Sequence, residues 1–326
     1  MRLLVTGANG LIGRAVLARA ATDGTLQLRG TTRNHGAELP DSVEPVAVGD
    51  LLPETDWSRG VDGVDAIVHT AARVHVMREV IADPLAEFRR VNVDGTLNLA
   101  RQAADAGVRR FVFLSSVKVN GEQTWPGAPY HADDVPAPID PYGISKHEGE
   151  LGLRGLAQES GMDVVIIRPV LAYGPGVKGN YLSLMRWLYK GLPLPLGAIH
   201  NQRSLVALDN LVDLIVTCLH HPSARNETFL VSDGEDLSTT GLLRRTAAAL
   251  GRPARLISVP TSVLRAAARV LGKADLAKRL CGSLQVDISK TRERLGWTPP
   301  VTIDDALKQT AQHFLANVHR RGTSVA

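Results

Sequence analysis

Six short apolar segments, each followed by a stretch with helical spacing, recur through the first half of the chain. They remain apolar over most of their length, are rich in β-branched residues, and span residues 2–6, 26–32, 45–49, 65–70, 109–116 and 163–169. Continuous apolar runs of this length are typical of parallel strands that helices cover on both faces. The pattern therefore predicts an α/β fold built on a doubly wound parallel sheet.

The second half of the chain has a different texture. Residues 175–203 are rich in glycine, proline and leucine, strand and helix signals return over 204–234, and helical patterns dominate from Ser238. We therefore predict a main domain over residues 1–174, with its last sheet elements returning at about 204–234. Residues 175–203 and 235–326 should form a smaller, mostly helical lobe.

Composition excludes several classes of protein. The 326 residues are 44% hydrophobic, with 37 basic and 33 acidic side chains, and no dense basic run with interleaved aromatics is present, so nucleic acid is not an expected partner. Cys218 and Cys281 lie far apart in apolar helical contexts, which favours buried thiols and a cytoplasmic protein. No apolar run reaches the roughly 18 residues of a spanning helix, so we expect no membrane association. The adjacent His220 and His221 suit a helix end, and no metal is assigned.

A glycine-rich turn follows the first predicted strand. The segment "TGANGLIGRAV" spaces Gly7, Gly10 and Gly13 three residues apart, with Leu11 and Ile12 opening the helix. Glycines at such a turn permit close backbone approach to a diphosphate, and the helix N-terminus supplies amide donors. The position between strand and helix, in the first βα turn of the series, predicts a dinucleotide site of the Rossmann type.

The end of the second strand bears on which nicotinamide cofactor binds. Sites for NAD usually place a carboxylate there, whereas this chain has Thr32 followed by Arg33. A guanidinium binds a 2′-phosphate well, so NADP(H) is favoured and NAD(H) remains possible. The alternative is an ordinary surface arginine. Other strand ends complete the predicted cofactor set with Asp50, Leu51, Ala71, Ala72 and Pro169.

Two side chains with acid–base chemistry lie four residues apart in "PYGISKHEGE". Asp140 is a good N-cap and Pro141 suits the first helical position, so Tyr142 and Lys146 should project from one face of the opening turns. Alone, such a pair is most often a solvated helix surface. The fifth strand ends in Ser115 and Ser116 at the same sheet edge, so serine, tyrosine and lysine can converge.

Eight short segments follow one another along the chain in this order: "TGANGLIG", "GDL", "HTAAR", "VNVDGTLNL", "FLSS", "YGISK", "IIRPVLAYGPG" and "LGWTP". Together they resemble the extended short-chain dehydrogenase/reductase superfamily and its NAD-dependent epimerase/dehydratase family. The resemblance covers essentially the whole chain. It implies that Tyr142 is the catalytic acid/base and that Lys146 binds the nicotinamide ribose and lowers the tyrosine pKa. It also implies that Ser116 hydrogen-bonds the reacting oxygen. Ser115 is the weaker serine candidate, because we expect it to point into the strand packing.

The resemblance also implies that residues 1–174 form the dinucleotide-binding domain and that the lobe of residues 175–203 and 235–326 binds a UDP-sugar substrate. Asn180 and Arg203 match positions that contact uracil-ribose and diphosphate in relatives, although Arg203 could instead be a surface salt-bridge residue. Dehydratases of the family carry an Asp-Glu pair after the catalytic serine or threonine. Here Val117 and Lys118 stand at those positions, so dehydration is not expected.

Three functions stay open at this point. The segments "SSVKVNGE", "ARVHVM" and "GSLQVDISKTRERLGWTPP" look closest to UDP-sugar 4-ketoreductases of the N-acetylquinovosamine type, which favours reduction of a 4-keto-6-deoxy UDP-sugar. A UDP-sugar 4-epimerase uses the same three side chains. A non-catalytic NADP-sensing regulator is the alternative from another class. Relatives often dimerise through two helices, here about 84–107 and 142–160, so a homodimer is expected.

Overall fold

A computed structural model of the chain describes residues 1–34, 39–74 and 83–322. Its main sheet has seven strands in the order β3-β2-β1-β4-β5-β6-β9, and every neighbouring pair is parallel. The strands are β1 (Arg2–Thr6), β2 (Gln27–Thr32), β3 (Val43–Ala47), β4 (Ala66–His69), β5 (Arg110–Leu114), β6 (Asp163–Pro169) and β9 (Thr228–Val231). The predicted doubly wound parallel sheet is confirmed.

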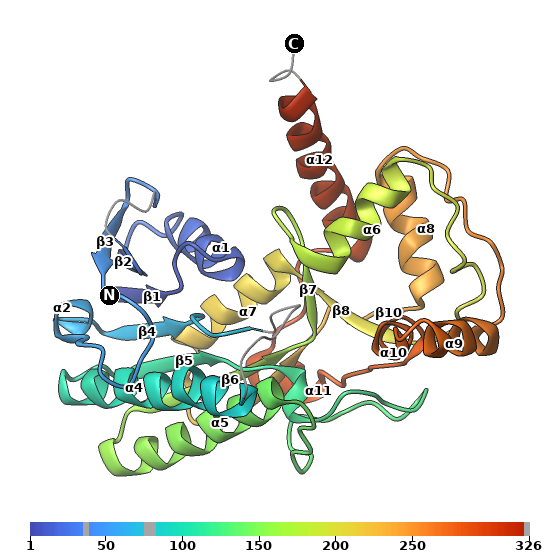
Figure 1. Ribbon diagram of the computed structural model, residues 1–326. Helices are drawn as coiled ribbons and strands as arrows, with labels where there is room; N and C mark the ends of the chain where they lie inside the picture. The colour runs from blue at the N-terminus through green and yellow to red at the C-terminus, as the bar shows by residue number, and fades with distance from the viewer. Residues whose placement is uncertain (35–38, 75–82, 323–326) are drawn as a thin grey trace.

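Helices cover both faces of this sheet (Figure 1). One face carries α1 (Leu11–Ala20) and α7 (Leu208–His220), which contact each other. The other carries the continuous run of α3 (Pro84–Arg89), a π-helical turn (Arg90–Gly95) and α4 (Thr96–Asp105), beside α5 (Pro141–Ser160). The side chains of β1 alternate between the two faces of the sheet. Leu3 and Val5 belong to one apolar cluster, and Leu4 belongs to another. Shorter elements here are α2 (Ser58–Val61), α11 (Ser289–Leu295) and the 3₁₀ turns Val117–Val119 and Pro222–Ala224.

A second sheet has three strands, and one of them, β8, was expected in the main sheet. It has the order β10-β8-β7, from β7 (Leu171–Tyr173), β8 (Arg203–Ala207) and β10 (Asp236–Leu237). Of the two strands predicted over 204–234, β9 joins the main sheet and β8 does not. The Ser204 hydroxyl donates to the Asp236 carboxylate at 2.5 Å, which adds a side-chain bond to the β8–β10 pairing.

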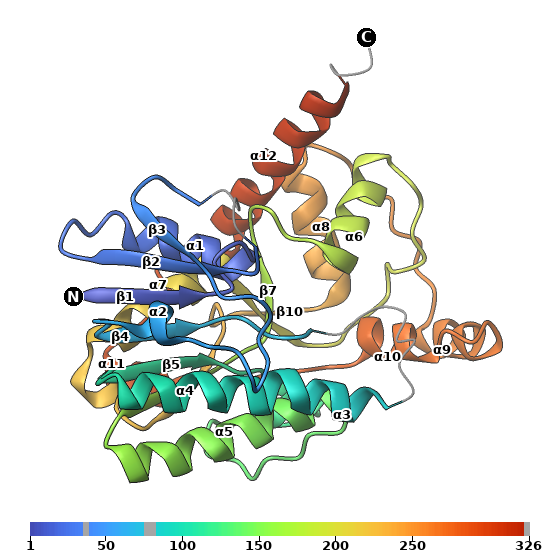
Figure 2. The same ribbon diagram turned by 60° about the vertical axis from the view of Figure 1, so that its left-hand side comes forward.

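The remaining helices pack around a separate apolar cluster. They are α6 (Gly179–Tyr189), α8 (Thr239–Ala249), α9 (Thr261–Val270), α10 (Ala274–Cys281) and α12 (Ile303–Gly322). Figures 1 and 2 show these helices beyond one end of the main sheet. The division into a cofactor domain and a substrate lobe remains a prediction.

Two smaller sequence predictions are confirmed. Cys218 and Cys281 are buried free thiols, and α7 ends at His220. Among the described helices, none is both long and apolar enough to cross a bilayer.

Candidate active site

The carboxyl ends of the parallel strands place the predicted cofactor residues at one edge of the sheet. From β1 the chain winds outward through β2 and β3, and then from β4 through β5 and β6 in the opposite direction. The winding therefore reverses between β1 and β4, which is the position where ligands bind in open α/β sheets. The glycine turn follows β1, and Ala71 and Ala72 follow β4.

The glycine turn is as tight as the sequence predicts. Gly7 has φ +67°, and a Cβ there would lie 2.9 Å from the Ala71 nitrogen. A Cβ on Gly13 would lie 2.3 Å from the Gly7 carbonyl oxygen, so only glycine lets α1 approach this closely. Gly10 caps α1 without a side-chain hydrogen bond, which leaves the amides of the first turn, including those of Leu11 and Ile12, to a ligand. These features fit the diphosphate of a dinucleotide.

Arg33 and Asp50, both in the predicted cofactor set, are neighbours. The Arg33 guanidinium is exposed, and its Nη1 lies 3.8 Å from Asp50 Oδ1. Such an exposed pair contributes about 0–1 kcal/mol, so a ligand phosphate can compete for the guanidinium. Thr32 is buried, and its hydroxyl donates to the Asn34 carbonyl oxygen at 3.0 Å. Leu51 is buried, and Pro169 ends β6 at the same edge.

The helix that carries Tyr142 begins as predicted. The Asp140 carboxylate accepts a hydrogen bond from the Gly143 amide at 2.7 Å, and Pro141 occupies the first helical position. Lys118 forms an ion pair with the other oxygen of Asp140. This pair connects the segment after β5 to the start of α5, so Ser116 and Tyr142 are held on adjoining elements.

Ser116 and Tyr142 are in direct contact. Their side chains form a hydrogen bond, and the Tyr142 ring packs edge-on against Phe88 with ring centroids 6.0 Å apart. Burial raises the pKa of Tyr142 to about 12, and the charge of Asp140 adds to this shift. The Ser116 hydrogen bond acts in the opposite direction. In this structure burial dominates, and the lowering of the tyrosine pKa by Lys146 stays a prediction.

Lys146 is itself buried one turn further along α5. Its ammonium group donates to the Leu114 carbonyl oxygen at 2.9 Å and lies 4.5 Å from the centre of the Phe113 ring. Burial lowers the pKa of Lys146 to about 7, although the nearby Glu150 carboxylate favours the charged form. A lysine that is only partly charged near pH 7 exerts a weaker field on a neighbouring phenol than a fully charged one.

Ser115 points away from this group, as the sequence reading expected. Its hydroxyl donates to Glu150 Oε1 at 2.6 Å. Glu150 also accepts from Arg168 at 2.8 and 2.6 Å, and both side chains are almost completely buried. Because Glu150 lies on α5 and Arg168 on β6, this ion pair fixes the Tyr142 helix against the sheet.

Sequence reasoning missed two buried polar residues at the site. The Asn92 carboxamide lies in the π-helical turn, accepts from the Arg73 amide at 2.8 Å and donates to the Ser145 hydroxyl at 3.1 Å. His69 lies between the hydroxyls of Thr6 and Thr96, at 2.7 and 3.0 Å, and burial lowers its pKa to about 3. The position of Asn92 between Val91 and Val93 in "VNVDGTLNL" was the available signal for it.

The predicted substrate residues lie on other elements. Asn180 is exposed in the first turn of α6, and Arg203 begins β8. Arg203 Nη1 donates to the carbonyl oxygens of Arg279 and Gly282 at 2.9 and 3.2 Å, and burial lowers the pKa of the guanidinium. No carboxylate among the described residues pairs with it, which argues against a surface salt bridge. Within the same residues, no hydrogen bond or ion pair joins Asn180 or Arg203 to Tyr142.

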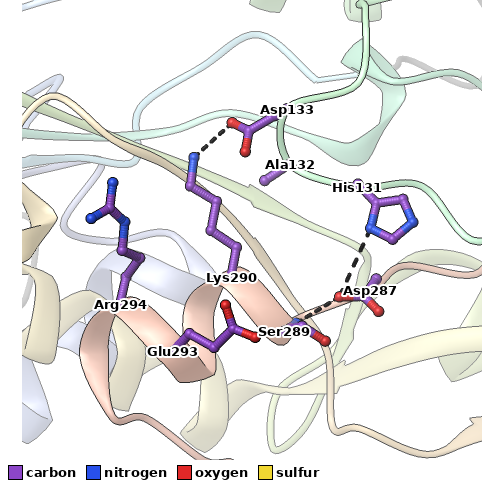
Figure 3. Close-up of a pocket in the computed structure, with 8 residues that line it drawn as sticks. All are labelled: His131, Ala132, Asp133, Asp287, Ser289, Lys290, Glu293 and Arg294. Carbon is purple, nitrogen blue, oxygen red and sulfur yellow. Dashed lines mark hydrogen bonds and ion pairs between the residues drawn. The ribbon is translucent and has the colours of Figure 1, made fainter.

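A polar cavity of about 470 Å³ lies elsewhere, between the 131–134 loop and α11 (Figure 3). None of the predicted site residues lines it. Its Lys290 is already paired with Asp133 at 2.6 Å and with Glu227 at 2.9 Å, so its positive charge is neutralised within the protein. In the part of the chain that the structure describes, no three histidine, cysteine or acidic side chains gather as a metal site would require.

Comparisons with known proteins agree with this geometry. The sequence model of the NAD dependent epimerase/dehydratase family matches residues 3–232. A UDP-glucose 4-epimerase of Vibrio cholerae is 48% identical over 314 residues, which cover 96% of this chain and 95% of that protein. An N-acetyl-α-D-glucosaminyl-diphospho-ditrans,octacis-undecaprenol 4-epimerase of Escherichia coli O157:H7 is 26% identical, over 95% and 94% of the two chains.

Solved structures share the fold. A UDP-glucuronic acid 4-epimerase of Bacillus cereus in complex with NAD superposes with a TM-score of 0.78 at 19% identity, over 97% of this chain and 99% of that one. A Pseudomonas aeruginosa protein named RMD, complexed with NADPH, gives a TM-score of 0.72 at 22% identity, over 97% and 99% of the two chains. The match of the family model to residues 3–232 and the 48% identical relative, covered over 95% of its length, establish that the chain belongs to the NAD-dependent epimerase/dehydratase family.

Proposed function

We propose that the protein catalyses hydride transfer at C4 of a UDP-linked hexose or N-acetylhexosamine, with 4-epimerisation as the net reaction. The observation that carries the proposal is the hydrogen bond between Ser116 and Tyr142, beside buried Lys146, at the edge that holds the glycine turn. The 48% identity to a UDP-glucose 4-epimerase supports the choice of reaction.

In this proposal each side chain has one task at the reacting carbon. Tyr142 takes the proton of the C4 hydroxyl and returns it to the C4 oxygen after inversion. Ser116 hydrogen-bonds that oxygen in both the hydroxyl and the ketone forms. A bound nicotinamide dinucleotide supplies the acceptor and donor of the hydride. Lys146 binds its ribose, and Asn180 and Arg203 bind the nucleotide of the substrate.

The pKa of Tyr142 determines how much the site must stabilise the phenolate for the residue to act as a base. A phenol with a pKa of about 12 must be stabilised by about 7 kcal/mol in its ionised form to act as a base at pH 7. The N-terminus of α5, the Ser116 hydrogen bond and the charged form of Lys146 all favour the phenolate. We therefore expect substrate turnover to rise with pH above neutrality.

Reduction of a 4-keto-6-deoxy UDP-sugar is the second candidate, and two observations favour it. Tyr142 is protonated at neutral pH in this structure, which suits an acid that donates to a carbonyl oxygen. Arg33 is exposed at the end of β2, where it can reach the 2′-phosphate of NADPH. We propose NAD as the cofactor of the epimerase and NADPH as that of the reductase.

One assay separates the candidates. Cofactor released from the purified protein is identified by absorbance and chromatography, and the protein is then incubated with UDP-glucose or UDP-N-acetylglucosamine without added cofactor. Retained NAD⁺ and formation of the galacto epimer are expected. Little bound cofactor, with stoichiometric NADPH consumption on a 4-keto UDP-sugar, would make the protein a reductase, and Arg33→Ala should then weaken NADPH more than NADH.

Tyr142→Phe provides the control for both chemistries. It should abolish turnover and leave UDP and cofactor affinities within about twofold, because proton transfer matters mainly in the transition state. Near-normal turnover in this variant would contradict the acid–base assignment. Absence of turnover in the wild-type protein with every sugar tested would instead favour a cofactor-sensing regulator.

We also propose a homodimer formed through the helices that span residues 84–105 and 141–160. These helices lie side by side on one outer face of the molecule (Figures 1 and 2), and Leu151 of α5 is exposed there. Light scattering of the wild type and of Leu151→Asp would test this, with a monomeric wild type as the contradicting result.

A further inference from the structure

The helical pair α9–α10 stands at the outer edge of the molecule, as Figures 1 and 2 show from two directions. Helix α9 is ten residues long, and none of them is buried. Its inner side packs on α10 through partly buried residues that include Leu264 and Ala268. The outer side therefore has no cover among the described residues.

That outer side is apolar. Val263, Ala266, Ala267 and Val270 are all exposed and recur at spacings of three, four and seven residues, so they form one stripe along the helix. Val270 is 86% exposed, and the following Leu271 extends the stripe. Isolated exposed apolar side chains are common, but a continuous stripe of them indicates a binding surface.

The same segment contains the excess positive charge of the protein. Residues 252–279 contain seven arginines and lysines and one acidic residue, Asp275, which gives the segment a net charge of +6. The whole chain carries +4, so the remaining residues together carry −2. Arg269 and Lys273 flank the apolar stripe, and neither forms an ion pair with a described carboxylate. Arg265 instead reaches the Cys281 thiol, and Lys278 pairs with Glu122.

An exposed tryptophan lies on a loop that is joined to α10, the partner helix of α9. Thr124 pairs with Ser283, just beyond the end of α10, and the next residue, Trp125, is exposed. The Glu122–Lys278 ion pair, at 2.6 Å, joins the same loop to α10. Tryptophan is enriched where proteins contact the boundary between lipid and water.

We propose that the outer face of α9, with Leu271 and the Trp125 loop, binds flat on an anionic lipid bilayer. An apolar stripe flanked by arginine and lysine is the pattern of helices that lie in the plane of a membrane surface. A second copy of this chain would bring two segments of charge +6 together, which the charges oppose. This binding differs from spanning the bilayer, and the sequence-based expectation of no membrane association considered only spanning helices.

Co-sedimentation with lipid vesicles tests the proposal. The full chain is mixed with vesicles of phosphatidylethanolamine and phosphatidylglycerol, or of phosphatidylcholine alone, at 0.1 M salt. We expect binding to the anionic vesicles only, weakened by added salt because the charges are exposed. Removal of two charges in Arg269→Gln/Lys273→Gln should lower the partition coefficient by roughly thirtyfold.

Matched variants separate the stripe from general charge and hydrophobicity. Val263→Asp/Val270→Asp should lower partitioning at least tenfold, whereas Val135→Asp, at an equally exposed valine beside Asp133 and Asp134, should leave it unchanged. The exposed pair Arg59→Gln/Arg186→Gln removes the same charge elsewhere and should also have little effect. Circular dichroism checks that each variant folds. If Val263→Asp/Val270→Asp does not fold, vesicle binding by Arg269→Gln/Lys273→Gln alone tests the proposal.

Three results would overturn the proposal. The first is equal binding to neutral and anionic vesicles, and the second is unchanged vesicle binding of both α9 variants. The third is no vesicle binding together with a wild-type dimer that Val263→Asp/Val270→Asp dissociates. That third result would mean that a second copy of the chain covers the outer face of α9. Because the assay needs no sugar substrate, its failure is independent of the proposed reaction.

Discussion

Glu150→Gln should destabilise the protein far more than Glu148→Gln, although the two residues lie only two positions apart on α5. Both glutamates bind an arginine through two hydrogen bonds. Glu150 binds Arg168 at 2.8 and 2.6 Å, and Glu148 binds Arg89 at 2.8 and 2.6 Å. The two residues therefore share the helix and the paired contact to an arginine and differ in burial, and Glu150 in addition accepts a hydrogen bond from Ser115.

The magnitudes follow from that burial. The side chains of Glu150 and Arg168 are 0% and 2% exposed, and removing one member of a buried pair costs about 3–5 kcal/mol. Those of Glu148 and Arg89 are 30% and 48% exposed, and such pairs contribute about 0–1 kcal/mol. For 326 residues the entropy of unfolding is about 0.7 kcal/mol/K. Glu150→Gln should thus lower Tm by about 4–7 °C, and Glu148→Gln by about 1 °C or less.

Thermal and urea unfolding of both variants, followed by circular dichroism at pH 7, measure the difference. The double variant Glu150→Leu/Arg168→Met should recover part of the lost stability, because it leaves no buried charge without a partner. Equal decreases in Tm for the two single variants would refute the reasoning, because burial would then not determine the cost.

Three further predictions concern the site. Because burial lowers the pKa of His69 from 6.5 to about 3, the unfolded chain binds more protons between those values, and stability falls as pH falls through that window. In His69→Gln the urea midpoint should depend less on pH between pH 6.5 and 4 than in the wild type. An unchanged pH dependence of the midpoint would contradict this. Gly13→Ala should weaken dinucleotide binding at least tenfold by calorimetry, whereas Gly24→Ala, where a Cβ meets nothing within 4 Å, should not. Arg203→Ala should weaken the binding of UDP itself, with Arg59→Ala as the control at an exposed arginine. Equal UDP affinities of the two variants would show that Arg203 does not bind the substrate.

The central sheet could be predicted because its signal is local. Buried parallel strands must be apolar along their length, and the glycine turn must lack a Cβ at Gly13, so both features are visible in short segments. The choice of sheet for β8 could not be predicted. Its five residues are as apolar as those of a main-sheet strand, and the pairing depends on β7 and on Asp236, more than 30 residues away on each side.

For the candidate site, the sequence predicted the positions of the residues better than their burial. The spacing of Tyr142 and Lys146, with Asp140 as the cap, placed both side chains on the opening turns of one helix. The raised pKa of Tyr142 could not be predicted, because it depends on how deeply the phenol is buried. The neighbours of Tyr142 and Lys146 include Phe88 and Phe113, which come from two other parts of the chain.

Lys146, bonded to the Leu114 carbonyl oxygen and with a pKa of about 7, makes ligand binding a proton-coupled event. In neutral solution a fraction of the free molecules therefore carries an uncharged amine at this position. An anionic ligand that favours the ammonium form must then draw protons from the buffer. The observed binding enthalpy would consequently depend on the ionisation enthalpy of the buffer, and affinity would decline as the solution becomes more alkaline. The lysine that we propose to bind the cofactor ribose would therefore also set the pH range over which the protein binds its ligand.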